Sequence, residues 1–193
     1  MESQGMNVIG LTGRNASGKG EVARLLKDLG FVYGSLSDVL REELRARGDA
    51  VSRDNLIAIG RELRGAHGSA VLAQRMQAGL GGDGNYVVDS FRHPSEVEWF
   101  REHQEGFSLW EVHASEEIRF SRICSRGRES DPTTLEAFRA LEQAEATRTE
   151  ESGQDLDGTA ALADRVIPNE QSFDELSGYV AEALRDLGVD FGS

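Results

Sequence analysis

Short apolar runs alternate along the chain with longer segments in which apolar residues recur every three or four positions. The short runs are typical of buried strands and cover residues 7–12, 31–36, 85–90, 107–114 and 163–169. The longer segments predict helices over residues 19–29, 37–47, 53–68, 69–80, 94–103, 115–126, 135–151 and 172–188. This alternation predicts an α/β fold with three layers, in which a five-stranded parallel sheet carries helices on both faces.

Length and composition narrow the class of protein. We expect the 193 residues to form a single domain, 1–193. A formal net charge of −13 argues against binding to a nucleic acid polymer, which needs clustered positive charge. No run reaches the roughly 18 apolar residues of a membrane span, and the first residues lack the features of a signal peptide. We therefore expect a cytoplasmic protein without membrane contact, as a monomer or a small homo-oligomer.

Two further expectations concern packing. The single Cys124 excludes an intrachain disulfide, and we expect it to be a small buried apolar residue. The acidic segment 141–157 is interpreted as a solvated helix face followed by a loop.

The most informative stretch is GLTGRNASGKGE, residues 10–21, which joins the first expected strand to the first expected helix. Its G-x-x-x-x-G-K spacing lets main-chain N–H groups surround phosphate oxygens. The helix that follows points the positive end of its dipole at the same anion, and the lysine adds a full positive charge. The pattern predicts a nucleotide phosphate site formed by Gly13, Arg14, Asn15, Ala16, Ser17, Gly18, Lys19, Gly20 and Glu21.

Gly20 stands directly after the lysine, where most such loops have a Ser or Thr hydroxyl that holds Mg²⁺. Adenylate kinase and the uridylate/cytidylate kinases are similar to this chain here, because their loop also reads G-K-G. That resemblance implies a metal carried largely by water and nucleotide phosphates, and it favours a phosphotransferase over a switch GTPase or a motor ATPase. The chain departs from those kinases at Glu21, where they usually have Thr.

Asp89 ends the third expected strand, and Arg92 follows three residues later. A carboxylate at this place can position Mg²⁺ through its waters, and a guanidinium can bind a phosphate with two hydrogen bonds. Because ligands of parallel sheets bind beyond the carboxyl ends of the strands, we expect both side chains beside the glycine-rich loop.

Three stretches carry a wider resemblance. DSFRHPSEVEWF, residues 89–100, resembles phosphomevalonate kinase and the phage-type deoxynucleoside monophosphate kinases. The opening, IGLTG…SGKGEVARLLKDLGF, and the close, ADRVIPNEQSFDEL, resemble dephospho-coenzyme A kinase. All of these belong to the nucleoside monophosphate kinase group of P-loop proteins. The resemblance implies a P-loop fold, ATP as phosphoryl donor, Mg²⁺ as cofactor, and Asn169 on the adenine side of the ATP site.

The resemblance also implies where the acceptor binds. In this group a helical region after the second strand receives the acceptor, here about residues 37–80, and the matching contacts are Ser37, Asp38, Arg41, Arg61, Arg64 and Arg92. Asp38 matches an aspartate near the acceptor hydroxyl of dephospho-coenzyme A kinase, and there it can orient or deprotonate the attacking oxygen. Alternatively, Ser37 or Asp38 caps the helix that follows the second strand.

A third implied feature is a mobile, arginine-bearing lid over about residues 122–150. Arg122 and Arg126 lie four residues apart and can face the site together, with Arg119 and Arg128 as further cations. Cations there can neutralise the charge that spreads over a phosphoryl group in transfer, although arginines near a helix C-terminus also complement its dipole. The catalytic candidates are thus Lys19, Asp38, Arg92, Arg122 and Arg126.

Three functions fit these observations. The first is an ATP-dependent phosphotransferase acting on a small phosphomonoester, above all a nucleoside or deoxynucleoside monophosphate. The second has dephospho-coenzyme A or another small phosphorylated alcohol as acceptor, which would profit from Asp38 as a base. The third is a regulatory protein that binds ATP and signals to a partner.

Overall fold

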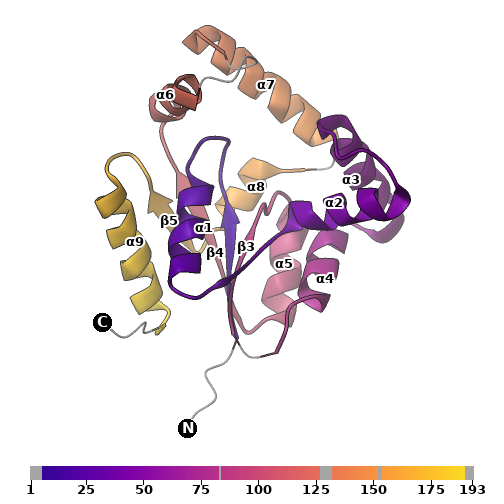
Figure 1. Cartoon of the computed structure of the whole chain (residues 1–193), viewed down its shortest axis with the longest axis horizontal. Coiled ribbons are helices and arrows are strands. Elements are labelled where there is room, and N and C mark those ends of the chain that lie inside the picture. Colours follow the sequence, from indigo (N-terminus) through magenta and orange to yellow (C-terminus); the bar gives the residue numbers. More distant parts are fainter. Residues whose placement is uncertain (1–5, 83, 127–131, 152–153, 190–193) are drawn as a thin grey trace.

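The computed structural model describes residues 6–82, 84–126, 132–151 and 154–189 (Figure 1). The strands are β1 (Asn7–Thr12), β2 (Val32–Ser35), β3 (Asn85–Asp89), β4 (Gly106–His113) and β5 (Arg165–Pro168). The helices are α1 (Lys19–Asp28), α2 (Leu36–Arg47), α3 (Arg53–His67), α4 (Val71–Ala78), α5 (Pro94–His103), α6 (Glu116–Arg126), α7 (Leu135–Glu151), α8 (Leu156–Ala161) and α9 (Phe173–Asp186). None of them combines the length and apolar content that crossing a bilayer requires.

The five strands form one parallel sheet in the order β2-β3-β1-β4-β5. β1 is central, and the sheet register places Ser35 of β2 opposite Asp89 of β3 at their carboxyl ends. Helices α1 and α9 cover one face, whereas α2, α4, α5 and α8 lie on the other, with α3 packed against α2 (Figure 1). The three-layer α/β prediction is confirmed.

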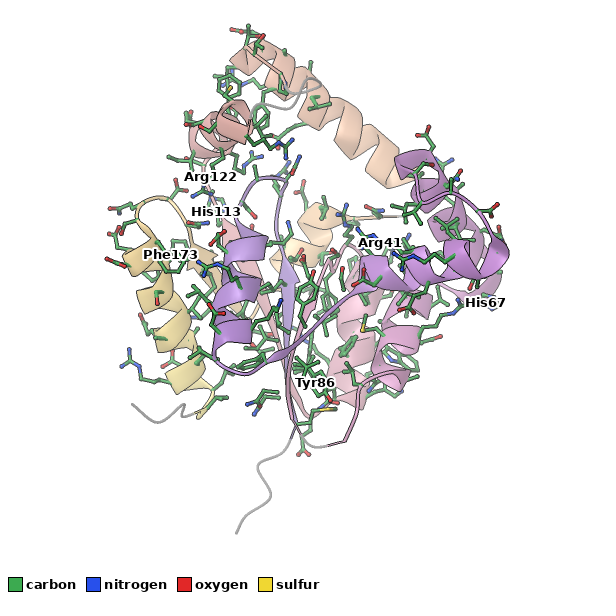
Figure 2. The ribbon with its side chains drawn as sticks, viewed as in Figure 1. Arg41, His67, Tyr86, His113, Arg122 and Phe173 are labelled. Carbon is green, nitrogen blue, oxygen red and sulfur yellow. The ribbon has the colours of Figure 1, made fainter. Side chains whose placement is uncertain are left out.

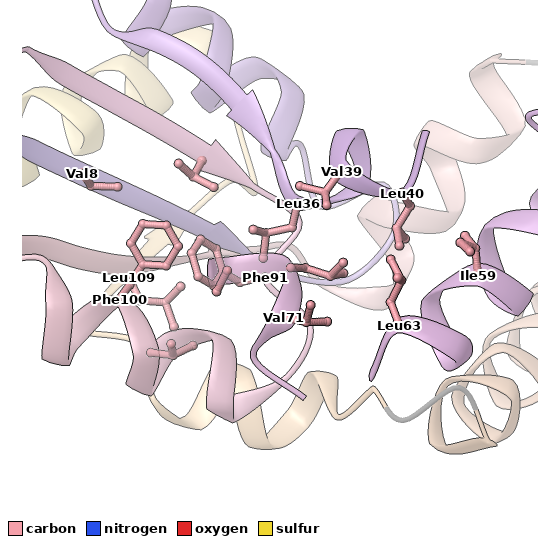
Figure 3. Close-up of a cluster of buried hydrophobic side chains, with 14 of the residues drawn as sticks. Val8, Leu36, Val39, Leu40, Ile59, Leu63, Val71, Phe91, Phe100 and Leu109 are labelled. Carbon is pink, nitrogen blue, oxygen red and sulfur yellow. The ribbon is translucent and has the colours of Figure 1, made fainter. Parts of the chain in front are cut away.

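Each face of the sheet has its own hydrophobic core. On one face, Ile9 and Leu11 of β1 pack with Leu26 of α1 and with Val180 of α9. On the other, Val8 and Leu109 pack beneath Phe91 and Phe100, and Leu36, Leu40 and Leu63 extend this cluster into α2 and α3 (Figure 3). Because burying one such side chain stabilises the fold by about 1.5–3 kcal/mol, these cores anchor the strand ends that carry the polar site residues.

The start of α2 differs from the prediction. The helix begins at Leu36, directly after β2, and the Ser35 hydroxyl caps it by accepting a hydrogen bond from the Ser37 N–H at 3.3 Å. The expectation that Ser37 or Asp38 caps this helix is therefore wrong. Asp38 lies within the first turn, where a carboxylate is also stabilised by the helix dipole.

Two other expectations are corrected. Helix α8 occupies part of a segment interpreted as a loop, because Asp155 caps it by accepting from the Gly158 N–H at 2.8 Å. A six-residue helix is too short for apolar periodicity to reveal it. Cys124 is exposed on α6 rather than buried.

Candidate nucleotide site

The glycine-rich loop occupies the space between the carboxyl end of β1 and the first turn of α1. Gly13 and Gly18 adopt positive φ angles of 136° and 100°, which residues with a Cβ rarely adopt. A Cβ at Gly13 would also lie 2.4 Å from the Val112 carbonyl oxygen of β4. Both glycines of the motif are thus required by backbone geometry, and no side chain of the described residues caps the N-terminus of α1, as suits an anion site.

Lys19 folds back over this loop. Its Nζ donates to the carbonyl oxygens of Gly13 at 2.6 Å and Arg14 at 3.2 Å. Burial lowers the pKa of the Lys19 ammonium to about 8, with the Asp89 carboxylate raising it and the Arg92 guanidinium lowering it further. Lys19 therefore shares one electrostatic neighbourhood with Asp89, the last residue of β3, and with Arg92 in the turn that follows, as the parallel-sheet rule predicts.

The outer loop residues are more open. Arg14 is exposed and pairs with Asp157 of α8 at 2.7 Å, and Asn15 is exposed beside it. Ala16 has a positive φ of 60°, an unusual conformation for a residue with a Cβ. The Ser17 side chain is buried, and its hydroxyl makes no hydrogen bond within the described residues.

Gly20 and Glu21 lie in the first turn of α1. A Cβ added at Gly20 would meet no atom within 4 Å. Packing would therefore accept a serine or threonine at this position. The Glu21 carboxylate is exposed and accepts from Arg24 at 3.0 Å, which reduces its repulsion of a bound anion. The two departures from the usual loop therefore leave open space beside Gly20 and a Glu21 charge that is partly balanced by Arg24.

The turn after β3 places Asp89 close to the loop. Asp89 is half-buried, and its Oδ1 accepts from the Ser90 N–H at 2.6 Å. Ser90 has a positive φ of 73°, and its hydroxyl lies 3.2 Å from that of Ser35. Within the described residues no group of three or more His, Cys, Asp or Glu side chains could hold a metal ion. A single carboxylate such as Asp89 suits a metal that keeps most of its waters.

The side of α2 that follows Ser35 carries the expected acceptor residues. Asp38 and Arg41 form an ion pair at 2.7 Å across one helical turn, and both are partly exposed. Ser37 is half-buried one residue earlier, and Arg61 is exposed on α3. Figure 2 shows Arg41 and Arg122 on opposite sides of the loop between β1 and α1.

Arg64 of α3 is buried, with a side-chain exposure of 7%, and its Nη2 donates to Glu96 Oε1 of α5 at 3.1 Å. The Nε and Nη1 atoms of Arg64 have no hydrogen-bond partner among the described residues. An unsatisfied buried donor costs about 1–3 kcal/mol, more when charged. Arg64 therefore keeps hydrogen-bonding capacity that its own surroundings leave unfilled.

Glu96 was not recognised from the sequence. It is fully buried, and its Oε2 accepts from the main-chain N–H groups of Arg92 at 2.9 Å and His93 at 3.1 Å. Burial raises the pKa of the Glu96 carboxyl, against the opposing effect of Arg64. One carboxylate thus joins Arg64 to the turn that carries Arg92. The available signal was an acidic residue on the apolar stripe shared with Val97 and Phe100.

Arg122 and Asn169 meet the phosphate loop from its other side. Arg122 Nη1 donates to the carbonyl oxygens of Ala16 at 3.2 Å and Ser17 at 3.1 Å, and Nη2 donates to the Asn169 carbonyl at 2.8 Å and its Oδ1 at 3.1 Å. Asn169 is buried and its Nδ2 donates to the Ser17 carbonyl at 2.9 Å. These two residues contact the loop main chain directly.

The remaining candidates of the expected lid are placed less closely. Arg126 is exposed at the end of α6, and Arg119 is buried and bound to the Glu142 carboxylate of α7. Arg128 lies outside the described residues, as does part of the 122–150 segment. Helices α6 and α7 lie above the loop in Figure 1, and a lid function for them stays a prediction.

Comparisons with known proteins agree with this geometry. A family model described as an AAA domain matches residues 9–149. A UPF0200 protein from Hyperthermus butylicus is 37% identical over 182 residues, which cover 93% of this chain and 92% of that protein.

Two solved structures illustrate the likeness in fold. TT1252 from Thermus thermophilus matches with a TM-score of 0.54 and 23% identity, over 95% of this chain and 99% of that one. Shikimate kinase from Bacteroides thetaiotaomicron matches with a TM-score of 0.55 and 13% identity, over 94% and 98%. The loop, the sheet order and these matches lead to one conclusion: the chain belongs to the UPF0200 family within the AAA-domain proteins, and it has the P-loop fold of the nucleoside monophosphate kinase-like group.

Proposed function

We propose that this protein is an ATP-dependent phosphotransferase whose acceptor is a small phosphomonoester, with nucleoside and deoxynucleoside monophosphates as the first candidates. The observation that carries the proposal is the buried guanidinium of Arg64, which has two nitrogen atoms without a partner and is linked through Glu96 to the turn beside Lys19. A regulator that only binds ATP would have no need for a second cation with unpaired donors.

The donor half of the site is the phosphate loop. The first N–H groups of α1 and the Lys19 ammonium bind the outer phosphates of ATP, and Lys19 exchanges its two carbonyl partners for phosphate oxygens. Because Lys19 is partly buried, its charge acts in a medium less polar than water, which strengthens its effect on the transferred phosphoryl group.

Mg²⁺ would supply charge neutralisation between the phosphates when bound. The residues fit such an ion: the half-buried Asp89 carboxylate lies in the neighbourhood of Lys19, and the open space at Gly20 leaves room for coordinated water. Asp89 would then orient the water molecules of the ion, since the described residues contain no group of three or more His, Cys, Asp or Glu side chains that could hold it.

The acceptor half lies across the loop. Arg41, Arg64 and Arg92 bind the acceptor phosphate, with the half-buried Ser37 and the exposed Arg61 as further contacts in the region 37–80. A phosphate oxygen is already anionic, so its attack on the terminal phosphorus of ATP needs positioning more than a base. Arg126 would add positive charge when the segment 122–150 approaches, as the lid interpretation expects.

The test is ADP release that depends on an added acceptor. Ribo- and deoxynucleoside monophosphates, dephospho-coenzyme A and phosphomevalonate are supplied one at a time with ATP and Mg²⁺, and the Lys19→Ala variant serves as blank. The proposal expects release with at least one phosphomonoester. ADP formation that never responds to an acceptor would favour the regulatory alternative.

A second candidate acceptor is the hydroxyl group of a phosphorylated alcohol. It is favoured by the partly exposed Asp38 carboxylate, which Arg41 holds in place at 2.7 Å in the first turn of α2. For this acceptor Asp38→Asn should lower turnover by about 10²–10⁴-fold, the effect of losing a general base. Little change would favour a phosphate acceptor.

A further inference from the structure

The phosphate loop is held in an unfavourable shape. Ala16 has a φ of 60°, a left-handed conformation that is unfavourable for a residue with a Cβ and persists only where the surroundings hold it. Behind the loop lies a cavity of about 240 Å³, lined by Arg14, Ser17 and Arg119 and by residues 111–116. Packing against β4 and α6 therefore does not by itself support the outer part of the loop.

Arg122 and Asn169 supply that support through the main chain. The carbonyl of Ala16 accepts from Arg122, and the carbonyl of Ser17 accepts from both Arg122 and Asn169. Gly18 makes the approach possible, since a Cβ there would lie 1.9 Å from Asn169 Nδ2. The second glycine of the motif is thus required by Asn169 as well as by its own φ angle.

The hydrogen bonds have a consequence for the opposite side of the loop. In a planar trans peptide the C=O and N–H groups point in opposite directions. Holding the Ser17 carbonyl toward Arg122 and Asn169 therefore turns the Gly18 N–H away from them, toward the concave side of the loop. The clasp orients a donor that a phosphate would accept from.

We propose that Arg122 and Asn169 form a two-residue clasp that presets the phosphate loop for the donor nucleotide, so that both are positioning residues and neither contacts the terminal phosphate. This assigns Arg122 a different role from the expected neutraliser of migrating charge, and Asn169 a different role from a contact to adenine. It also ties α6 and the segment after β5 to the loop. The proposal rests on the proposed function only for the identity of the ligand.

The experiment compares Arg122→Met, Asn169→Ala and the double variant with the natural protein, and Ser121→Ala, on the exposed face of α6 beside Arg122, is the matched control. Calorimetric titration measures the affinity for ATP, ADP and inorganic pyrophosphate. Amide hydrogen exchange of residues 16–20 is measured without nucleotide, and thermal unfolding checks that each variant is folded. Arg122→Lys, which keeps the charge but not the fork of donors, is a milder fifth variant.

We expect each single substitution to lower the affinity for all three ligands by a similar factor of about 10 to 100, the effect of losing charged hydrogen bonds. The affinity of the double variant should be only slightly lower than that of the single variant with the lower affinity, because the two residues act as a unit. Exchange of the loop amides should rise in the variants and stay unchanged in Ser121→Ala. The acceptor KM should not change.

Two results would overturn the clasp. One is a loss at Arg122 confined to ATP, with ADP and pyrophosphate unaffected, since that pattern marks a contact to the terminal phosphate. The other is unchanged loop exchange in folded Asn169→Ala. If the natural protein binds no ATP, the proposed function fails, but the exchange measurement still decides whether the clasp exists.

Discussion

The two halves of the candidate site differ in how far the protein satisfies its own polar groups. On the donor side, the carbonyls of Gly13, Arg14, Ala16 and Ser17 all accept hydrogen bonds from Lys19, Arg122 or Asn169. On the acceptor side, the buried Arg64 has two nitrogen atoms without partners. The loop carbonyls on the donor side are therefore held in place, although the buried Ser17 hydroxyl there has no partner among the described residues. On the acceptor side, by contrast, two donors of a charged group stay unpaired.

This difference has a functional meaning. A phosphate tail is the same in every ATP molecule, so a fixed loop can be built for it from main-chain groups. An acceptor varies in chemistry, and under the proposed function its recognition would depend on side chains such as Arg64 and Arg41, which lie on separate helices. Substitutions on the two sides should consequently affect different kinetic parameters.

Lys19→Met should have the largest effect. Transfer should fall by at least about 100-fold, since the ammonium acts on the charge that develops in transfer. The free energy of unfolding should rise by about 1–3 kcal/mol at neutral pH, because a buried charge with a pKa lowered to about 8 is removed. This gain should fade as the pH rises from about 8 to 10.5, where the lysine of the natural protein loses its charge.

Lys27→Met is the control, because Lys27 is the only other lysine of the chain and is exposed on the same helix. Steady-state ADP release and urea unfolding provide the two readouts. Near-normal turnover of Lys19→Met would contradict the assignment of Lys19 and its loop as the donor side of the site.

Arg64→Lys should affect the acceptor side alone. The KM for the acceptor should rise by about 10 to 100-fold, since an ammonium cannot reproduce the bonds of a guanidinium fork. The KM for ATP should stay within about twofold, because Glu96 and not the loop holds Arg64. Arg45→Lys, exposed on α2, is the control in the same kinetic assay. An equal rise in both KM values would mean that the halves are not separate.

The affinity for ATP should depend on pH through Lys19. Its pKa of about 8 means that the free loop carries the full charge below that pH and loses it above. Affinity should therefore be level near pH 7 and fall by up to about tenfold per unit above pH 8. Lys19→Arg stays charged throughout and should lose this dependence. Calorimetric titration over this pH range measures the affinity. An affinity of the natural protein that does not change with pH would contradict the assignment of Lys19 to ATP binding.

Gly20→Ser should produce the smallest change. The open space at this position accepts the new side chain, and serine favours the helix by a few tenths of a kcal/mol. The added hydroxyl should lower the Mg²⁺ concentration needed for half-maximal activity by about two- to tenfold. Gly178→Ser, at an equally open glycine of α9, is the control in the same Mg²⁺ titration. An unchanged requirement would show that the metal does not approach Gly20.

The donor loop was predictable because its chemistry is local. Seven consecutive residues, 13–19, contain the glycines, the lysine and the helix start, so spacing alone indicated a phosphate site. Asp89 and Arg92 followed from the rule that parallel strands gather their carboxyl ends. The Asp38 cap was wrong because β2 runs into α2 without a connecting residue, and Ser35 serves both elements.

Other contacts lay beyond the reach of pattern. The buried Glu96 looked like one of several glutamates on a helix, and its importance depends on Arg64, 32 residues away. Asn169 is 152 residues from the carbonyl of Ser17 that it holds. Such pairs depend on how helices and loops meet across the sheet. A single sequence does not show which of its distant residues come into contact.

By itself, the sequence determined the alternation of strands and helices, the anion loop and the cation within it, since each depends on neighbours in the chain. Only the tertiary structure decided which cations have their donors occupied and which keep unpaired donors. Arg122 and Arg64 carry the same charge in the sequence. In the structure, the carbonyls of the loop and of Asn169 accept the hydrogen bonds of Arg122, whereas two nitrogen atoms of Arg64 have no partner among the described residues. The physical reason is that a charge acquires its role from the groups around it after folding.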